Sequence, residues 1–404
     1  MSRSIPALVN PPLLIWAREE AGYAVEAVAD WLKVPADLLR AWESGTEKPS
    51  VAKAQSLAKF YHRPFGVFYL PQKPNTPSLA AEFRRLPGVK PGVESPELRL
   101  ALRLLSWRRG AALELSETLG LKADEFATKL SLAESPAAAG ARLRALLGVT
   151  PEQQLGWRNE WQAWRAWRTA AERAGVLVFQ FPKVPLTQAR GVSLLRFPLP
   201  AVGINSKETA PGARAFTLVH ELVHLALAAG REEQTAQNER RDDAAWAEVE
   251  RFAEETASAV LVPEEMLQTH LASLSVPQDG WDVPLVRRMA STFRITPLAM
   301  ATRLRAEGAL TRAGYSRWKE SWLAYLSTLA LRSGGFASPV DKTLGRAGRP
   351  LVKLVLEAMD TNQITAVDAA RYLDLGFHHF DQLRTALRPG PSAGADQAGD
   401  DDGD

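Results

Sequence analysis

The stretch RAFTLVHELVHLALAAG, residues 214–230, contains an H-E-x-x-H pattern formed by His220, Glu221 and His224. Its other positions are almost all apolar, no proline interrupts it, and it ends at Gly230, so it predicts a buried helix. Residues four apart share one helix face, so both imidazoles can bind the same ion. Glu221 lies about 100° around the helix from His220, where its carboxylate can hold a metal-bound water. The stretch therefore predicts a helix that carries a catalytic metal ion, with zinc as the simplest choice.

A third metal ligand is expected on the next helix. Catalytic zinc takes three protein ligands and keeps one position open, and the chain has no cysteine to supply one. In AAWAEVERFAEETASAVLVP, residues 244–263, Glu250 falls in the middle of an apolar stripe at about 100° per residue. We expect Glu250 to be the ligand, with His270 as the alternative. Glu254, one turn further on, is expected to orient a ligand histidine, although a simple pair within the helix also explains it. The stripe consists of Trp246, Ala253, Ala257 and Leu261.

The sequence before the motif changes from helical to strand-like. GVLVFQF (175–181), GVSLL (191–195) and AVGIN (201–205) are short runs rich in β-branched or aromatic residues, and proline-containing turns separate them. A few strands followed by long helices are typical of α+β domains. We therefore expect a predominantly α-helical α+β protein with a small sheet.

Composition narrows the classes of function. The 404 residues include no cysteine, which excludes disulfides and thiolate metal sites and indicates a reducing compartment inside the cell. The N-terminus lacks the apolar run of a signal peptide, and no stretch approaches the ~20 apolar residues that span a bilayer. We expect a cytoplasmic protein without membrane contact. A net charge of +3 does not by itself indicate nucleic-acid binding.

Residues 175–263 resemble the ImmA/IrrE family of metallopeptidases. The matching pieces are the strand GVLVF, the segment RGVSLL, the strand AVGIN, the motif FTLVHELVH and the helix VERFAEETASAVLVP. The resemblance implies a zincin-like domain in which His220, His224 and Glu250 bind Zn²⁺ and Glu221 is the general base. The chain departs from the family's usual residues at three positions. The departure at Glu254 weakens the expectation that this residue orients a ligand histidine. Val223 stands where Gly is common, Glu254 where Asn is common and Thr256 where Phe is usual.

The N-terminal region shows a second resemblance. The run VPADLLRAWESGTEKPS, residues 34–50, resembles the recognition helix and exit segment of Cro/C1-type (XRE) helix-turn-helix domains. Together with FRRLPGV (83–89), this order resembles long ImmA/IrrE-type proteins that carry such a domain in front of the peptidase. The resemblance implies a helix at about residues 36–42 that docks in a major groove of DNA.

The charge of this region does not favour specific DNA binding over other roles. Residues 1–70 hold eight lysines and arginines against seven aspartates and glutamates. On the expected recognition helix only Asp37 and Arg40 could read base edges. A fold kept for protein contacts or dimerisation is an equally good interpretation.

Changes in composition divide the chain into six segments. The expected segments are an XRE-type helix-turn-helix domain at 9–70, a Pro-rich connector and helical region at 71–150, an ImmA/IrrE-like zinc peptidase core at 151–275, a helical extension of the peptidase region at 276–335, a separate C-terminal helical module at 341–388 and a disordered acidic tail at 389–404.

Three functions compete on the sequence alone. The first is a regulatory zinc endopeptidase that cleaves a protein partner, with a transcriptional repressor as the expected substrate. The second is an XRE-type transcription factor that binds DNA and uses the zinc domain for sensing or structure. The third is an antitoxin-like interaction protein with a vestigial site. Glu221 argues against the third, because a purely structural zinc site needs no general base beside its ligands. The near-neutral charge of the N-terminal region argues against the second.

Overall fold

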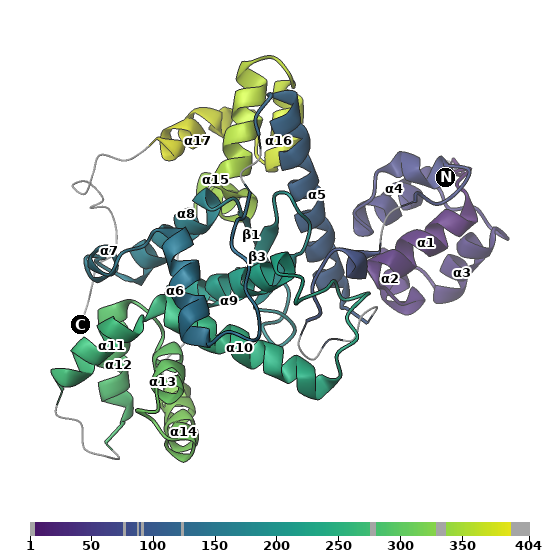
Figure 1. Ribbon diagram of the computed structural model, residues 1–404. Helices are drawn as coiled ribbons and strands as arrows, with labels where there is room; N and C mark the ends of the chain where they lie inside the picture. Colours follow the sequence, from purple (N-terminus) through teal and green to yellow (C-terminus); the bar gives the residue numbers. More distant parts are fainter. Residues whose placement is uncertain are drawn as a thin grey trace.

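The computed structural model describes residues 5–75, 78–86, 89, 93–122, 125–274, 280–328 and 337–388. This part of the chain is predominantly helical and contains a three-stranded sheet (Figure 1). The α+β class expected from the sequence is therefore confirmed. The acidic segment 389–404 lies outside the described residues. Within them, no helix has the length and apolar character that crossing a bilayer requires.

The sheet contains β1 (Leu177–Phe181), β2 (Gly191–Leu194) and β3 (Ala201–Asn205), close to the three strands expected. Its order is β1-β3-β2, with β1 parallel and β2 antiparallel to β3. Side chains of successive residues point to opposite faces of a sheet. On β2, Ser193 therefore faces one layer of helices while its neighbours Val192 and Leu194 face the other.

Helices cover both faces of the sheet. α8 (Glu160–Arg173) and α9 (Pro211–Ala229) pack on one face, and α5 (Pro96–Thr118) and α15 (Pro339–Asp360) pack on the other (Figure 1). Glycine at position 203 allows α5 to come close, because a Cβ there would lie 2.2 Å from a methyl group of α5.

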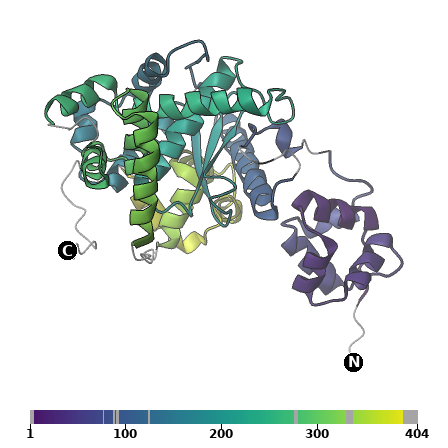
Figure 2. The ribbon, with the colours of Figure 1, turned by 90° about the horizontal axis from the view of Figure 1, so that it is seen from below.

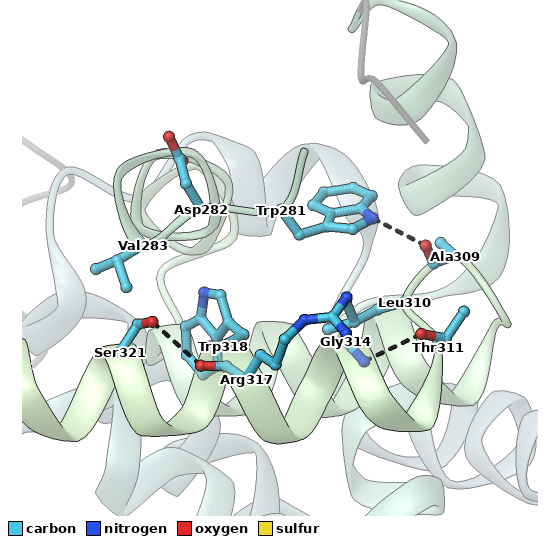
Figure 3. A pocket seen from close by; sticks show the side chains of 10 residues that line it. All are labelled: Trp281, Asp282, Val283, Ala309, Leu310, Thr311, Gly314, Arg317, Trp318 and Ser321. Atoms are coloured by element: carbon cyan, nitrogen blue, oxygen red, sulfur yellow. Dashed lines mark hydrogen bonds between the residues drawn. The ribbon is translucent and has the colours of Figure 1, made fainter. Parts of the chain in front are cut away.

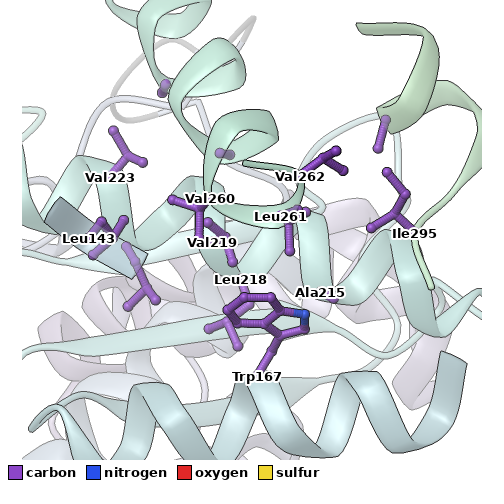
Figure 4. Packing of buried hydrophobic residues seen from close by; sticks show 14 of the residues in the cluster. Leu143, Trp167, Ala215, Leu218, Val219, Val223, Val260, Leu261, Val262 and Ile295 are labelled. Carbon is purple, nitrogen blue, oxygen red and sulfur yellow. The ribbon is translucent and has the colours of Figure 1, made fainter. Parts of the chain in front are cut away.

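The motif helix α9 is held in the larger of the two cores. Figure 4 shows the ring of Trp167 from α8 beneath Ala215 and Leu218 of α9, with Val260 and Leu261 of α10 (Asp243–Leu261) nearby. These side chains are all buried. Trp164 and Trp167 of α8 thus serve packing, and α9 and α10 lie side by side.

Further helices enclose α10 and extend the domain. α10 packs on α6, α9 and α13. A hollow beside α14 is lined by Trp281, Arg317 and Trp318, and the indole of Trp281 donates to the carbonyl of Ala309 at 2.8 Å (Figure 3). This hollow contains none of the candidate site residues. The helices of this layer are α6 (Pro136–Leu147), α7 (Pro151–Leu155), α11 (Glu264–Ala272), α12 (Val283–Phe293), α13 (Pro297–Ala306) and α14 (Arg312–Thr328).

Segment 341–388, expected as a separate module, shares a core with the sheet. Leu351 and Val355 of α15 lie in one buried cluster with Phe179 of β1 and Leu105 of α5. A segment of this size buries little apolar surface alone, and the sheet offers it a face. The helices that follow α15 are α16 (Ala366–Leu373), η3 (Phe377–His379) and α17 (Phe380–Leu387).

The N-terminal helices form a unit with its own core, set apart at one end of α5 (Figures 1 and 2). Arg99 and Arg103 of α5 hold it by donating to the backbone carbonyls of Glu19 and Tyr61, at 2.8 and 3.2 Å. The unit contains α1 (Pro11–Ala21), α2 (Val25–Leu32), α3 (Ala36–Ser44), α4 (Val51–Phe60) and η1 (Phe65–Tyr69).

Candidate metal centre

Three side chains from α9 and α10 converge at the contact between these helices. His220, His224 and Glu250 each offer a ligand atom, and these atoms all lie within 4.8 Å of one another. The Nε2 atoms of the two histidines are 3.1 Å apart. The carboxylate oxygens of Glu250 lie 3.4 Å from Nε2 of His220 and 3.5 Å from Nε2 of His224. The three residues expected as metal ligands are thus brought together.

The donor set fits a divalent cation. The carboxylate of Glu233 lies 2.7 Å from Nδ1 of His224, and both side chains are fully buried. With the Nδ1 proton donated to Glu233, Nε2 of His224 presents a lone pair to the centre. Because the Nε2 atoms of the two imidazoles face each other at 3.1 Å, they need a shared cation or proton between them. Two nitrogens, one carboxylate and no thiolate match a zinc site of the catalytic type.

Glu233 was not identified from the sequence as an orienting residue. It lies after α9, in a stretch without helical periodicity, so the sequence does not predict the direction of its side chain. The expectation that Glu254 plays this role is corrected: its side chain is exposed and lines a surface hollow with Arg251 and Arg305. His270, the alternative ligand, packs its ring against Phe293 instead.

Helix geometry explains the position of Glu254. The buried face of α10 is centred on Val249, Ala253 and Val260 rather than on Glu250. At about 100° per residue, Glu250 lies at the edge of that face, and each step of four residues turns about 40° further. Glu250 therefore still reaches the cluster, whereas Glu254 turns out to solvent.

Glu221 points from α9 toward the sheet edge, where β2 receives it. Ser193 donates its hydroxyl to a carboxylate oxygen of Glu221 and, at 3.2 Å, to the Glu221 backbone carbonyl. Position 191 must be glycine for this fit, because a Cβ there would lie 2.8 Å from the Glu221 carboxylate and 2.5 Å from a methyl group of Thr217. The small residues of β2 thus make room for the expected general base.

Arg84 is the largest feature of the site that sequence reasoning missed. Its guanidinium donates from Nε and Nη2 to both carboxylate oxygens of Glu221, at 2.9 and 2.8 Å. Its Nη1 lies 3.2 Å from Glu250. The side chain of Arg84 is only 3% exposed. The available signal was FRRLPGV (83–89), which on sequence supported a resemblance and nothing more.

Arg84 sets the protonation of both carboxylates. Burial alone would raise the pKa of Glu221, but the charge of Arg84 and its paired hydrogen bonds lower that pKa to about 2. For Glu250, burial again acts upward, and Arg84 followed by His220 brings the pKa well below its usual range. Both groups are therefore carboxylates in this structure.

The two residues expected to contact DNA lie on α3, far from this centre in the fold (Figure 1). Arg40 forms ion pairs with Asp37, at 2.9 Å, and with Glu26. Asp37 is almost fully exposed. The structure thus shows Arg40 in contact with carboxylates of its own unit.

Comparison with known families supports one of the two resemblances. Residues 171–305 match the family model of the IrrE N-terminal-like domain, Peptidase_M78. The match runs from the end of α8 to α13, about a third of the chain, and includes His220, His224 and Glu250. It supports the ImmA/IrrE resemblance and a metallopeptidase domain here; the XRE-type assignment of the N-terminal unit stays a prediction. No curated protein matches the sequence.

Proposed function

We propose that the chain is a zinc-dependent endopeptidase that acts in regulation and cleaves a protein partner, with a helix-turn-helix repressor as the substrate. The observation that carries the proposal is the cluster of His220, His224 and Glu250, in which His224 is buried and the other two are partly buried, with the buried Glu221 beside it. The match of residues 171–305 to a metallopeptidase family model supports the same reaction class.

Each residue of the centre then has a defined task. When bound, zinc would act as a Lewis acid: it would lower the pKa of a water to about 7 and polarise the scissile carbonyl. Glu221 accepts the proton and delivers it to the leaving amine. Ser193 orients the Glu221 carboxylate, and Glu233 keeps the Nε2 lone pair of His224 turned to the centre.

The choice of substrate rests on the layout of the chain. The metal cluster lies between helices in the body of the protein, and the N-terminal unit is a separate body docked at the end of α5. Such a unit can hold a partner and raise the effective concentration of one scissile loop near the site. A repressor is the partner that the ImmA/IrrE resemblance implies.

An XRE-type regulator with a sensory or structural zinc domain remains the second candidate. The observation in its favour is that Arg84 occupies both oxygens of Glu221, as it would in a site that needs no base. The two candidates differ in whether Glu221 takes part in a reaction.

Incubation of zinc-loaded protein with candidate repressors from the same genome tests the proposal. Glu221→Gln keeps the size of the side chain but cannot accept a proton, so it should retain zinc and lose cleavage. Glu248→Gln, an exposed change on α10, is the matched control and should cleave normally. Equal cleavage by the wild type and Glu221→Gln would exclude Glu221 as the base. Digestion of casein at many sites, with no preference for any repressor, would instead indicate a general peptidase.

A further inference from the structure

Residues 78–86, here called the strap, run along the edge of the sheet beside the metal centre. After η2 (Leu79–Ala81) the chain extends, and the Arg84 amide donates to the Ser193 carbonyl at 3.2 Å. The Leu195 amide donates to the Glu82 carbonyl at 2.9 Å. The strap is therefore paired antiparallel to β2, with Phe83 opposite the last residue of that strand.

The strap is paired on its other side as well. The Ala236 amide donates to the Phe83 carbonyl at 2.7 Å, and Arg84 forms a bridge with Thr235. Thr235 and Ala236 follow Glu233, the residue that orients His224. The strap thus fills the slot between an edge strand and the loop that supports the metal centre.

This slot has the character of a peptide-binding site. The edge of a sheet presents unpaired N–H and C=O groups, and an extended polypeptide can add to it as a further strand. β2 is the edge strand nearest Glu221, since Ser193 of β2 touches that carboxylate. A polypeptide that lies along β2 passes directly beside the expected base, and the strap lies in that position.

The side chain at the centre of the strap engages the catalytic groups themselves. Arg84 and Ser193 together donate three hydrogen bonds to the two oxygens of Glu221. A third nitrogen of Arg84 reaches Glu250, one of the three expected ligands. While Arg84 stays there, three of the roughly four acceptor sites of the Glu221 carboxylate are occupied and its charge is balanced by the guanidinium, so Glu221 is a poor proton acceptor for a water.

We propose that the strap is a built-in, substrate-like inhibitor: it occupies the β2 edge, and Arg84 neutralises Glu221 and competes with the metal for Glu250 until an extended substrate displaces it. Displacement of the strap by a substrate rests on the proposed peptidase function. Competition between Arg84 and the metal for Glu250 does not depend on that function. It supplies a restraint on proteolysis within the chain, which a peptidase inside a cell requires.

The anchors of the strap explain why the inhibited state persists. Phe83 is buried in the core shared by α5 and α15. Glu82 accepts from Arg196 at 2.7 Å and from the hydroxyl of Ser106. Arg85 pairs with Asp243 at the start of α10. These contacts lie outside the metal cluster, so they can hold the strap while Arg84 blocks the site.

The primary test is the zinc affinity of the metal-free, full-length chain, measured against a chromophoric chelator. Arg84→Gln removes the competing cation and the charge that repels Zn²⁺, so it should tighten zinc binding by about tenfold or more. Arg190→Gln is the control, because Arg190 pairs with Glu208 away from the strap and should leave the affinity unchanged. Unchanged or weaker zinc binding in a folded Arg84→Gln chain overturns the proposal.

A second pair of variants guards against loss of folding, since Arg84→Gln leaves the Glu221 carboxylate without its cationic partner. Glu221→Gln alone and together with Arg84→Gln keep all three expected ligands and bury no unpaired carboxylate at position 221. The double variant should bind zinc more tightly than Glu221→Gln, through release of Glu250. If the double variant does not fold either, Arg84 is a structural element and the proposal is wrong.

Cleavage of carboxymethylated casein separates this proposal from the proposed function. Zinc-loaded Arg84→Gln should cleave at least about tenfold faster than the wild type, because Glu221 is freed as a base and the strap loses the side chain that ties it to the metal centre. No cleavage by either chain, with tighter zinc binding in Arg84→Gln, would reject the peptidase and keep the strap as a regulator of metal binding. Cleavage by the wild type that Arg84→Gln abolishes would make Arg84 part of the reaction and overturn the proposal.

Discussion

Two arginines in different regions each pair with two carboxylates, and their surroundings give those pairs opposite properties. Arg40 on α3 of the N-terminal unit meets Glu26 and Asp37 with about half of its side chain exposed, 51%. Arg84 on the strap meets Glu221 and Glu250 and is 3% exposed. An exposed pair contributes about 0–1 kcal/mol and exchanges partners readily. A buried cation cannot leave unless another partner replaces it beside the carboxylates. Only the contacts of Arg84 can therefore hold a site in one state.

The largest effect is expected where the buried carboxylate and imidazole groups meet. His224→Ala removes a central ligand and leaves Glu233 buried without a partner, so zinc affinity should fall on the order of a thousandfold. Metal analysis of the purified chain and chelator competition would measure it. His378→Ala, an exposed histidine on η3, should retain about one zinc per chain. Full zinc occupancy in a His220→Ala, His224→Ala chain would place the metal elsewhere.

Direct comparison of the two arginines should give the next largest effect. Arg84→Ala leaves the buried carboxylate of Glu221 without its cationic partner, so the free energy of unfolding of the metal-free chain should drop by about 3–5 kcal/mol. Arg40→Ala should change it by no more than about 0.5 kcal/mol. Denaturant titrations followed by tryptophan fluorescence would measure both. Similar losses in the free energy of unfolding for Arg84→Ala and Arg40→Ala would show that the buried pair stabilises the chain no more than the surface pair does.

Glu233 and Glu254 allow a similar comparison around the metal. Glu233→Gln should weaken zinc binding by about 10- to 100-fold, because the amide no longer accepts the Nδ1 proton as a carboxylate does. Glu254→Gln should leave zinc affinity within about twofold, since that side chain is exposed. Stronger weakening by Glu254→Gln would restore the role first expected for it from the sequence.

The sequence specified the parts of this molecule that local periodicity determines. The i, i+4 spacing of His220 and His224 on an apolar helix was enough to identify the candidate metal helix. The strands at 177–181, 191–194 and 201–205 followed from short β-branched runs. Glu250 was found because it lies within reach of the buried face of a regular helix.

The parts that were missed depend on contacts between distant segments. Arg84 and Glu221 are 137 residues apart, and no periodicity relates them. Glu233 lies in an irregular segment whose direction is set by tertiary packing. The expectation that 341–388 forms a separate module was wrong for the same reason, because the apolar face of α15 is visible in sequence but its partner, the sheet, is not. Helix patterns show that a face is buried, and do not show against what.

Acidification should weaken the buried pair in a defined range of pH. The pKa of Glu221 is about 2 in the folded chain, below its ordinary value of 4.5, chiefly because the charge of Arg84 outweighs the effect of burial. Its contribution to stability is therefore fully present above pH 4.5 and is lost as the pH falls toward 2. The stability difference between the metal-free wild type and Glu221→Gln should shrink across that interval. Parallel stability curves for the two chains would contradict the pairing.

The smallest effect is expected at the exposed pair, where the N-terminal unit would meet DNA. The full-length chain should bind duplex DNA weakly, with dissociation constants in the range of about 10⁻⁶ to 10⁻⁴ M at physiological salt. Each neutralised phosphate adds roughly −0.9 to the slope of log K against log salt, and few net positive charges are available in residues 1–70.

Arg40 must first exchange Glu26 and Asp37 for a phosphate. Arg40→Ala should therefore change the slope by less than about 1. Fluorescence anisotropy over a salt series would measure this. Nanomolar, sequence-specific binding that Arg40→Ala abolishes would show that Arg40 recognises DNA bases, and would favour the transcription-factor candidate over the peptidase.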